Sequence, residues 1–262
     1  MRLERYRPQP PEILKSILPF TLAALYLPLI VMVIGSFVDL GAFTLRWYQE
    51  VFADPILWSA LIRSFVVAIG AATASTLLGF VGALALDKWL FRGRFWLRTL
   101  SVLSLMLPEL VLSLSLLSWF ALWGVPLSLF TVIAAHVTLT LPFVILVIGA
   151  RLRGLDPAYD DAARDLGAQE WQILTKITAP LLAPATLTAF LLAFLLSFDD
   201  FLVTFYTNGA GSDTLPVRLY SLMKTGLTPK IQALSSIMLI VSIILISILV
   251  QLRAVNDLSE PT

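Results

Sequence analysis

The sequence predicts an all-α integral membrane protein with six transmembrane helices and both chain ends in the cytoplasm. Of its 262 residues, 58% are apolar or aromatic and 13% are charged, whereas about 25% of the residues of a soluble domain are charged. The mean hydropathy is +0.89. This composition excludes a disordered chain, a nucleic-acid-binding protein and an ordinary soluble enzyme. Membrane lipid is therefore the first expected partner.

Residues that bind metals or form covalent intermediates are scarce. The chain has no cysteine and a single histidine, His136. Disulfides, iron–sulfur clusters, cysteine nucleophiles and two-histidine zinc motifs are therefore excluded. We expect no catalytic residue and no metal site, and we expect His136 to be a hydrogen-bonded packing residue.

Six apolar segments approach or exceed the roughly 20 residues that a helix needs to cross a bilayer. The first is too long for a signal peptide and precedes no cleavage pattern, so it is expected to remain as an anchor. Only Gly124 and Val125 separate the third segment from the fourth, which predicts a tight hairpin. The six segments are Ile17–Val38, Ser64–Leu86, Thr99–Trp123, Pro126–Ala150, Leu181–Phe198 and Ile231–Gln251.

Basic residues are distributed unevenly between the two sides of these spans. Thirteen of the 18 lysines and arginines lie in the N-terminal tail, in the loops after spans two and four, and in the C-terminal tail. Cytoplasmic segments carry an excess of Lys and Arg, so these four segments are expected to face the cytoplasm. The whole chain, residues 1–262, is expected to form one membrane domain.

The loop after the fourth span has the pattern of two short helices. Asp156 and Pro157 favour a helix start, because Asp accepts bonds from free N–H groups and Pro fits the first turn. Apolar residues then recur every three or four positions, and Gly167 stands where a left-handed residue ends a helix. A second helical stretch includes Trp171, and Pro180 marks the beginning of span five. This pair could lie on the bilayer as an amphipathic hairpin, or it could fill a groove on a partner protein.

The same loop resembles the cytoplasmic EAA loop of ABC importer permeases. The pattern of that family is Glu-Ala-Ala, three residues, Gly, nine residues, Ile, one residue and Leu-Pro. The chain departs from it at Asp161, which replaces Glu, and at Ala179, which replaces Leu. The matching residues, within a loop assigned to 156–180, are Asp161, Ala162, Ala163, Gly167, Ile177 and Pro180.

The resemblance implies a fold, a location and a set of partners. It implies an inner-membrane permease with a cytoplasmic coupling helix between the fourth and fifth spans, docked on an ATPase. The partners would be a second homologous permease, an ATPase dimer and a periplasmic or extracellular substrate-binding protein. No lysine in the chain follows a glycine, so a Walker A loop is absent. ATP and Mg²⁺ are therefore expected in the partner ATPase, with no cofactor in this chain.

Glu109 is the most informative residue inside a predicted span. On a straight helix it lies about 15 Å beyond Thr99, near the middle of the membrane. Carboxylates at that depth usually face a cavity or a partner helix. Pro108 precedes it and is expected to kink the helix and to free a backbone carbonyl. Glu109 is accordingly predicted to line a substrate path, or to pair structurally with another helix.

Asp199 and Asp200 end the fifth span, between Phe198 and Phe201. At 1.5 Å per residue they lie about 27 Å from Leu181, near the outer face. Adjacent carboxylates and aromatic rings could guide a cation by charge and by cation–π contact. The alternative is an ordinary helix end within an interfacial aromatic belt.

The segment from SFDD through LPVRLYS to the beginning of span six resembles the PotC-type permeases of spermidine/putrescine importers. This resemblance covers about fifty residues and implies a polyamine substrate. Three alternatives remain: an ABC permease for another organic amine or an iron complex, an ion-coupled secondary transporter, and a structural subunit of a membrane enzyme. The secondary transporter would explain Glu109 but not the EAA spacing.

Overall fold

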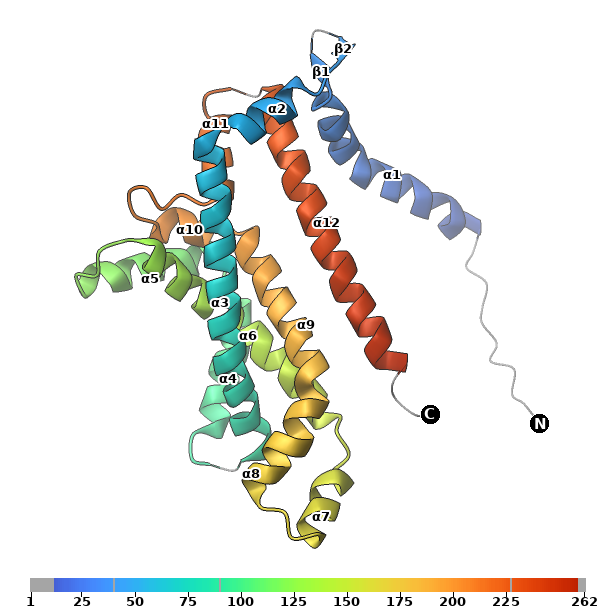
Figure 1. Ribbon diagram of the computed structural model, residues 1–262, viewed down its shortest axis with the longest axis vertical. Helices are drawn as coiled ribbons and strands as arrows, with labels where there is room; N and C mark the ends of the chain where they lie inside the picture. Colours follow the sequence, from blue (N-terminus) through green and yellow to red (C-terminus); the bar gives the residue numbers. More distant parts are fainter. Residues whose placement is uncertain (1–11, 40, 90, 227, 259–262) are drawn as a thin grey trace.

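The computed structural model describes residues 12–39, 41–89, 91–226 and 228–258, and these are mostly helical (Figure 1). Arg2, Arg5 and Arg7, which support the predicted orientation, lie outside the described residues. A short hairpin, β1 (Val38–Asp39) and β2 (Ala42–Phe43), follows the first helix. The helices are α1 (Glu12–Gly35), α2 (Arg46–Ala53), α3 (Pro55–Lys88), α4 (Arg94–Met106), α5 (Glu109–Leu122), α6 (Leu129–Arg153), α7 (Ala158–Asp165), α8 (Glu170–Ile173), η1 (Leu174–Thr178), α9 (Ala179–Phe198), α10 (Leu202–Thr207), α11 (Leu215–Met223) and α12 (Pro229–Leu258).

Five helical segments of the described chain are long and apolar enough to cross a membrane, and a bent pair makes a sixth if it is counted as one span. The five are α1, α3, α6, the continuous helix Glu170–Phe198 and α12. They match the first, second, fourth, fifth and sixth predicted spans. The predicted all-α membrane class is therefore confirmed.

The core forms where α3, α6 and α9 pack against one another. Small residues allow α3 and α6 to approach closely, since a Cβ on Gly79 would overlap the side chain of Val144. The buried hydroxyls of Ser75 and Thr140 lie 2.6 Å apart across the same contact. Close packing and interhelical hydrogen bonds hold membrane helices together, because lipid is as apolar as their side chains.

The helix α1 stands apart from this core. It contacts α12 and leans away from the other helices (Figure 1). In its described apolar stretch, Ile17–Gly35, no residue of the most apolar window is buried. Lipid or another protein chain must therefore cover most of α1.

The third predicted span is not one helix. The chain breaks after α4 and continues as α5 at an angle of 114°. Pro108 lies at the break, as expected for a residue that cannot donate a helix hydrogen bond. The carbonyl that Pro108 would leave unpaired is that of Ser104, four residues earlier. It is not free, because it accepts a bond of 3.4 Å from the N–H of Leu107. The depth predicted for Glu109 assumed a straight helix from Thr99. The bend shows that this assumption is wrong.

Two other boundaries differ from the prediction. The helix of span five begins at Glu170, eleven residues before Leu181, because α8, η1 and α9 form one continuous helix. The second helix of the cytoplasmic loop is thus the first part of span five, and Pro180 lies in it instead of starting it. The link between α5 and α6 spans residues 123–128, longer than the hairpin predicted from Gly124 and Val125.

Candidate substrate pocket and cytoplasmic loop

A pocket of about 630 Å³ lies where α4 and α5 bend apart and where α9 ends. It brings together four of the predicted path residues, Glu109, Asp199, Asp200 and Phe201, with α6 as another wall. Apolar side chains make up most of the remaining lining. Phe198 does not belong to this site: it is 1% exposed and packs in the core, with its ring centroid 5.1 Å from that of Phe65.

The carboxyl groups of Glu109 and Asp200 lie within hydrogen-bond reach of each other. Two carboxylates this close repel each other unless a proton or a cation lies between them. The repulsion is strong in apolar surroundings, where the effective dielectric constant is low. The pair is therefore suited to holding a positively charged group.

Asp200 is fixed in place from several sides. Its carboxylate accepts hydrogen bonds from the backbone N–H groups of Val203 and Thr204, at 3.3 and 2.9 Å, as a cap at the beginning of α10. The hydroxyl of Thr204 and Nε2 of His136 lie 3.2 and 3.1 Å from its Oδ2. Asp200 is 6% exposed, so it is a rigid acceptor and not a freely moving side chain.

His136 is a hydrogen-bonded packing residue, as predicted. It is fully buried, with Nδ1 2.6 Å from Ser197 Oγ and Nε2 2.9 Å from Thr204 Oγ1. Its contact with Asp200 was not predicted, because 64 residues separate the two positions. A lone buried histidine on a membrane helix was the signal that could have prompted a search for a carboxylate partner.

Asp199 lies beside the middle of α12 and not near an end of the helix bundle. Its carboxylate accepts hydrogen bonds of 2.9 and 3.1 Å from the hydroxyl of Ser242, which is thirteen residues into α12. The prediction placed Asp199 near one end of the bundle, and the contact with Ser242 does not agree with that position. The physical reason is that the helix of span five begins early and ends part-way along α12. Helices α10 and α11 complete the part of the bundle away from α7 (Figure 1).

The loop predicted to be cytoplasmic, which carries α7 and α8, has the expected helical start and turn. Asp156 Oδ1 accepts a hydrogen bond of 2.9 Å from the N–H of Ala158, and Gly167 has a φ of +80°. Ala163 is buried, whereas Asp161 and Ala162 are exposed. Ile177 is half-buried and Pro180 is exposed. Three large side chains of this loop are exposed, although side chains of this kind are usually buried. Tyr159, Leu166 and Trp171 are 55%, 88% and 58% exposed.

Lys88 connects this loop to two long helices. Its Nζ lies 2.7 Å from Asp160 Oδ2 on α7 and 2.8 Å from Thr178 Oγ1. Lys88 is the last residue of α3, and Thr178 precedes α9. A displacement of α7 would therefore act on both α3 and the helix that ends at the acidic pocket.

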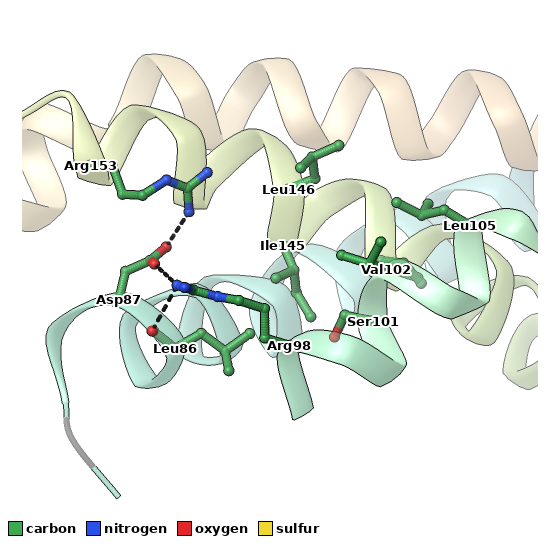
Figure 2. Close-up of a pocket in the computed structure, with 10 residues that line it drawn as sticks. Leu86, Asp87, Arg98, Ser101, Val102, Leu105, Ile145, Leu146 and Arg153 are labelled. Carbon is green, nitrogen blue, oxygen red and sulfur yellow. Dashed lines mark hydrogen bonds and ion pairs between the residues drawn. The ribbon is translucent and has the colours of Figure 1, made fainter. Parts of the chain in front are cut away.

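A second polar junction joins α3, α4 and α6 beside a cavity of about 230 Å³ (Figure 2). Asp87 accepts hydrogen bonds of 2.5 Å from Arg98 and 2.8 Å from Arg153, and Arg98 also donates to the carbonyl of Leu86. Figure 2 shows both guanidinium groups converging on the one carboxylate. In the sequence alone, these two arginines indicate only the orientation of the chain.

Residues 75–261 match the family described as "Binding-protein-dependent transport system inner membrane component". The chain belongs to this family. As a member of the binding-protein-dependent transport family, it is a multi-pass protein of the inner membrane and a transport subunit, not an enzyme. The predicted location and the resemblance to importer permeases are confirmed.

Individual relatives agree with this assignment. "Spermidine/putrescine transport system permease protein PotC" of Haemophilus influenzae is 39% identical over 230 residues, covering 86% of this chain and 90% of the relative. "Putrescine transport system permease protein PotI" of Escherichia coli K12 is 35% identical over 228 residues, covering 82% and 81%. The fold is similar to that of a bacterial ABC transporter that imports alginate, with a TM-score of 0.71, 16% identity and 95% of each chain covered.

Proposed function

We propose that this chain forms half of the translocation path of an ABC importer for polyamines such as spermidine and putrescine. The observation that carries the proposal is the pocket that Glu109, Asp199 and Asp200 line, in which the carboxyl groups of Glu109 and Asp200 interact. A polyamine carries several ammonium groups joined by methylene chains. Closely placed carboxylates match the ammonium groups, and the apolar lining matches the methylene chains. Relatives named as spermidine and putrescine permeases support the choice of substrate.

The proposal includes an orientation and a coupling element. Both chain ends and α7 would lie on the cytoplasmic side, where the uneven distribution of basic residues places them. The exposed Tyr159, Leu166 and Trp171 would then dock into a cleft of an ATPase subunit. Lys88 would pass the motion of α7 to α3 and α9.

The partners follow from the same proposal. A second homologous permease would complete the path and cover apolar surface such as that of α1. Two ATPase subunits would bind ATP and Mg²⁺, and an external binding protein would deliver the substrate. A small organic amine other than a polyamine is the second candidate, because it would use the same carboxylates. The family assignment disfavours a secondary transporter.

Uptake of labelled spermidine and putrescine tests the proposal. Cells that lack this chain are compared with the same cells complemented by it, with unlabelled polyamines and anions as competitors. We expect uptake that returns with the chain and is blocked by polyamines but not by anions. Uptake that is unchanged by complementation would reject the polyamine substrate.

Variants of the pocket test the path. Glu109→Gln and Asp199→Asn remove a charge with little change in shape, and we expect each to lower uptake tenfold or more, roughly the effect of losing one charge-assisted contact. The matched control is Glu50→Gln, which removes a carboxylate of α2 that pairs with exposed Arg46. The ATPase should co-purify equally with all three variants. Equal uptake by all three would contradict the path.

A further inference from the structure

The cavity of about 230 Å³ beside Asp87 has a charged end and an apolar end (Figure 2). The charged end is formed by Asp87, Arg98 and Arg153, where α3 and α6 end and α4 begins. Figure 2 shows the apolar side chains of α4 and α6 extending away from these three residues. The apolar lining residues of the two helices are Val102, Leu105, Pro142, Ile145 and Leu146. A cavity of this shape fits a molecule with a polar head and an apolar tail.

The charged end carries an excess of positive charge. Two guanidinium groups share one carboxylate, so one positive charge remains. The side chain of Asp87 is 6% exposed, whereas those of Arg98 and Arg153 are 48% and 52% exposed. Within the described residues, each arginine donates its hydrogen bonds through a single Nη atom, although a guanidinium group has five N–H donors. The two arginines can therefore bind a further anion.

The neighbouring carboxylates are engaged elsewhere. Asp156 and Asp160 line an adjacent cavity of about 150 Å³, which Arg153 also borders. Asp160 forms an ion pair of 2.7 Å with Lys88, and Asp156 accepts a hydrogen bond from a backbone N–H group of α7. Among the ion pairs of the described residues, Asp87 is the one carboxylate partner of both arginines.

The position of the cavity matches the depth at which a membrane helix meets the lipid head groups. Helix α4 begins at Arg94, followed by Phe95 and Trp96, which are 72% and 67% exposed. Exposed aromatic rings beside basic residues are typical of helix ends at the membrane surface. Pro142 lies eleven residues before Arg153, the last residue of α6, so the apolar walls extend about 16 Å from the end of that helix. The apolar end would therefore lie among acyl chains.

We propose that this cavity binds an anionic phospholipid. Its phosphate group accepts hydrogen bonds from Arg98 and Arg153, and one acyl chain lies along Val102 and Leu146, which are both 50% exposed. Basic pockets between membrane helices are known to bind anionic head groups. A phospholipid fits better than a protein partner, because one molecule supplies the anion and the apolar chain in the order in which the cavity presents them. The lipid attaches α4, which has no buried residue, to α3 and α6.

Binding of fluorescent phosphatidylglycerol to the purified, delipidated transporter tests the site. Unlabelled phosphatidylglycerol should compete, whereas the same concentration of phosphatidylcholine with the same acyl chains, or of inorganic phosphate, should not. Arg98→Gln combined with Arg153→Gln should weaken binding about tenfold or more, the effect of losing charge-assisted hydrogen bonds. The matched control is Arg46→Gln, which removes an exposed arginine paired with Glu50 on α2 and should bind the lipid as the wild type does.

Three results of this experiment would overturn the site. Equal competition by phosphatidylcholine would mean that the bound lipid is not selected by charge. Displacement by inorganic phosphate alone would identify a phosphate-ion site that has no acyl-chain part. Equal binding by the double arginine variant and the Arg46→Gln control would place the bound lipid elsewhere on the protein.

Two further variants decide the question if the double variant does not fold. Val102→Trp fills the apolar end and leaves the arginines in place, so it should weaken binding about fourfold or more, the effect of losing one buried methylene group. Asp87→Asn removes the anion with which the lipid phosphate competes, so it should strengthen binding about two- to fivefold, the range of a partly exposed ion pair. A junction that only supports the fold predicts weaker binding by Asp87→Asn, and that result would contradict the proposal.

A photoreactive amino acid at position 102 identifies the occupant in native membranes. We expect irradiation to attach a phospholipid, which mass spectrometry of the purified chain detects, and we expect the anionic class to be enriched relative to the surrounding membrane. A crosslink to another protein chain alone would show that a protein covers the cavity and would reject the lipid site. These measurements do not depend on the transported substrate, so the site and the proposed polyamine path stand or fall separately.

Discussion

His136 Nε2 lies 3.1 Å from Asp200 Oδ2, and the two side chains are 0% and 1% exposed. The contact connects the middle of the helical core to the acidic pocket, since His136 belongs to α6 and Asp200 precedes α10. Asp200 cannot turn away from the pocket without leaving both the histidine and the backbone N–H groups of α10.

We predict that His136→Ala destabilises the protein and lowers uptake. The change leaves a buried carboxylate without one of its donors, which costs about 1–3 kcal/mol. His136→Gln keeps a polar side chain of similar reach and should lose less. Thermal unfolding in detergent and uptake of labelled polyamine measure the two effects. Wild-type stability of the alanine variant would mean that the histidine does not support Asp200.

Gly167 sets the geometry of the loop between α7 and α8 through its backbone. With φ at +80°, a side chain there is strained although nothing lies within 4 Å of an added Cβ, and the strain costs about 1–2 kcal/mol. Gly167→Val should therefore lower uptake severalfold while the chain still inserts, whereas Gly167→Asn, which tolerates this conformation, should remain active. Uptake and ATPase co-purification from membranes distinguish the two variants. Full uptake by Gly167→Val would contradict the coupling role.

Asp87 holds the first part of α4 through Arg98, and no residue of this helix is buried. We expect Asp87→Asn to weaken this attachment by about 1–3 kcal/mol, because two arginines lose their shared anion. Hydrogen exchange should then increase in the α4 segment, residues 94–106, and much less in α6. The control is Asp39→Asn, which breaks an exposed pair with Arg46 at 3.6 Å and should cost less than about 1 kcal/mol. Similar exchange in both variants would show that the junction does not restrain α4.

Asp54 joins the beginnings of α3 and α12. Burial alone raises the pKa of Asp54, but the hydrogen bond from Lys230 and those from the backbone N–H groups of Leu57 and Ile56 outweigh it, so the pKa lies below its usual value of 3.8. A carboxyl whose pKa is lowered by folding stabilises the fold fully above its unfolded pKa and loses this contribution as the pH falls through its folded pKa.

We therefore expect the beginnings of α3 and α12 to be insensitive to pH near neutrality and to loosen only below about pH 4. Asp54→Asn should remove this acid dependence and cost about 1 kcal/mol at neutral pH, the usual effect of losing a helix cap and its ion pair. The fluorescence of Trp58, whose indole N–H donates to the carbonyl of Phe52 nearby, can follow the change in detergent. Identical acid transitions in both proteins would assign the transition to other carboxyls.

Features that depend only on residues adjacent in the sequence were predictable from it. The apolar runs of α1, α3, α6 and α12 identify spans, because a bilayer crossing needs an uninterrupted apolar length. The left-handed turn at Gly167 follows from a local backbone requirement. The broken third span was only half predictable: Pro108 indicated a kink, but its size depends on what α4 and α5 pack against.

The sequence by itself determined that this protein is a helical membrane permease and which acidic residues enter the apolar region, because composition, periodicity and motif spacing are properties of the chain alone. Only the tertiary structure decided that Glu109 and Asp200 face each other, that His136 holds Asp200, and that Phe198 is a core residue. Helices of different lengths pack at positions that no local pattern specifies. The physical reason is that a carboxylate's partners come from whichever helices lie beside it, and side-chain packing over the whole bundle sets that arrangement.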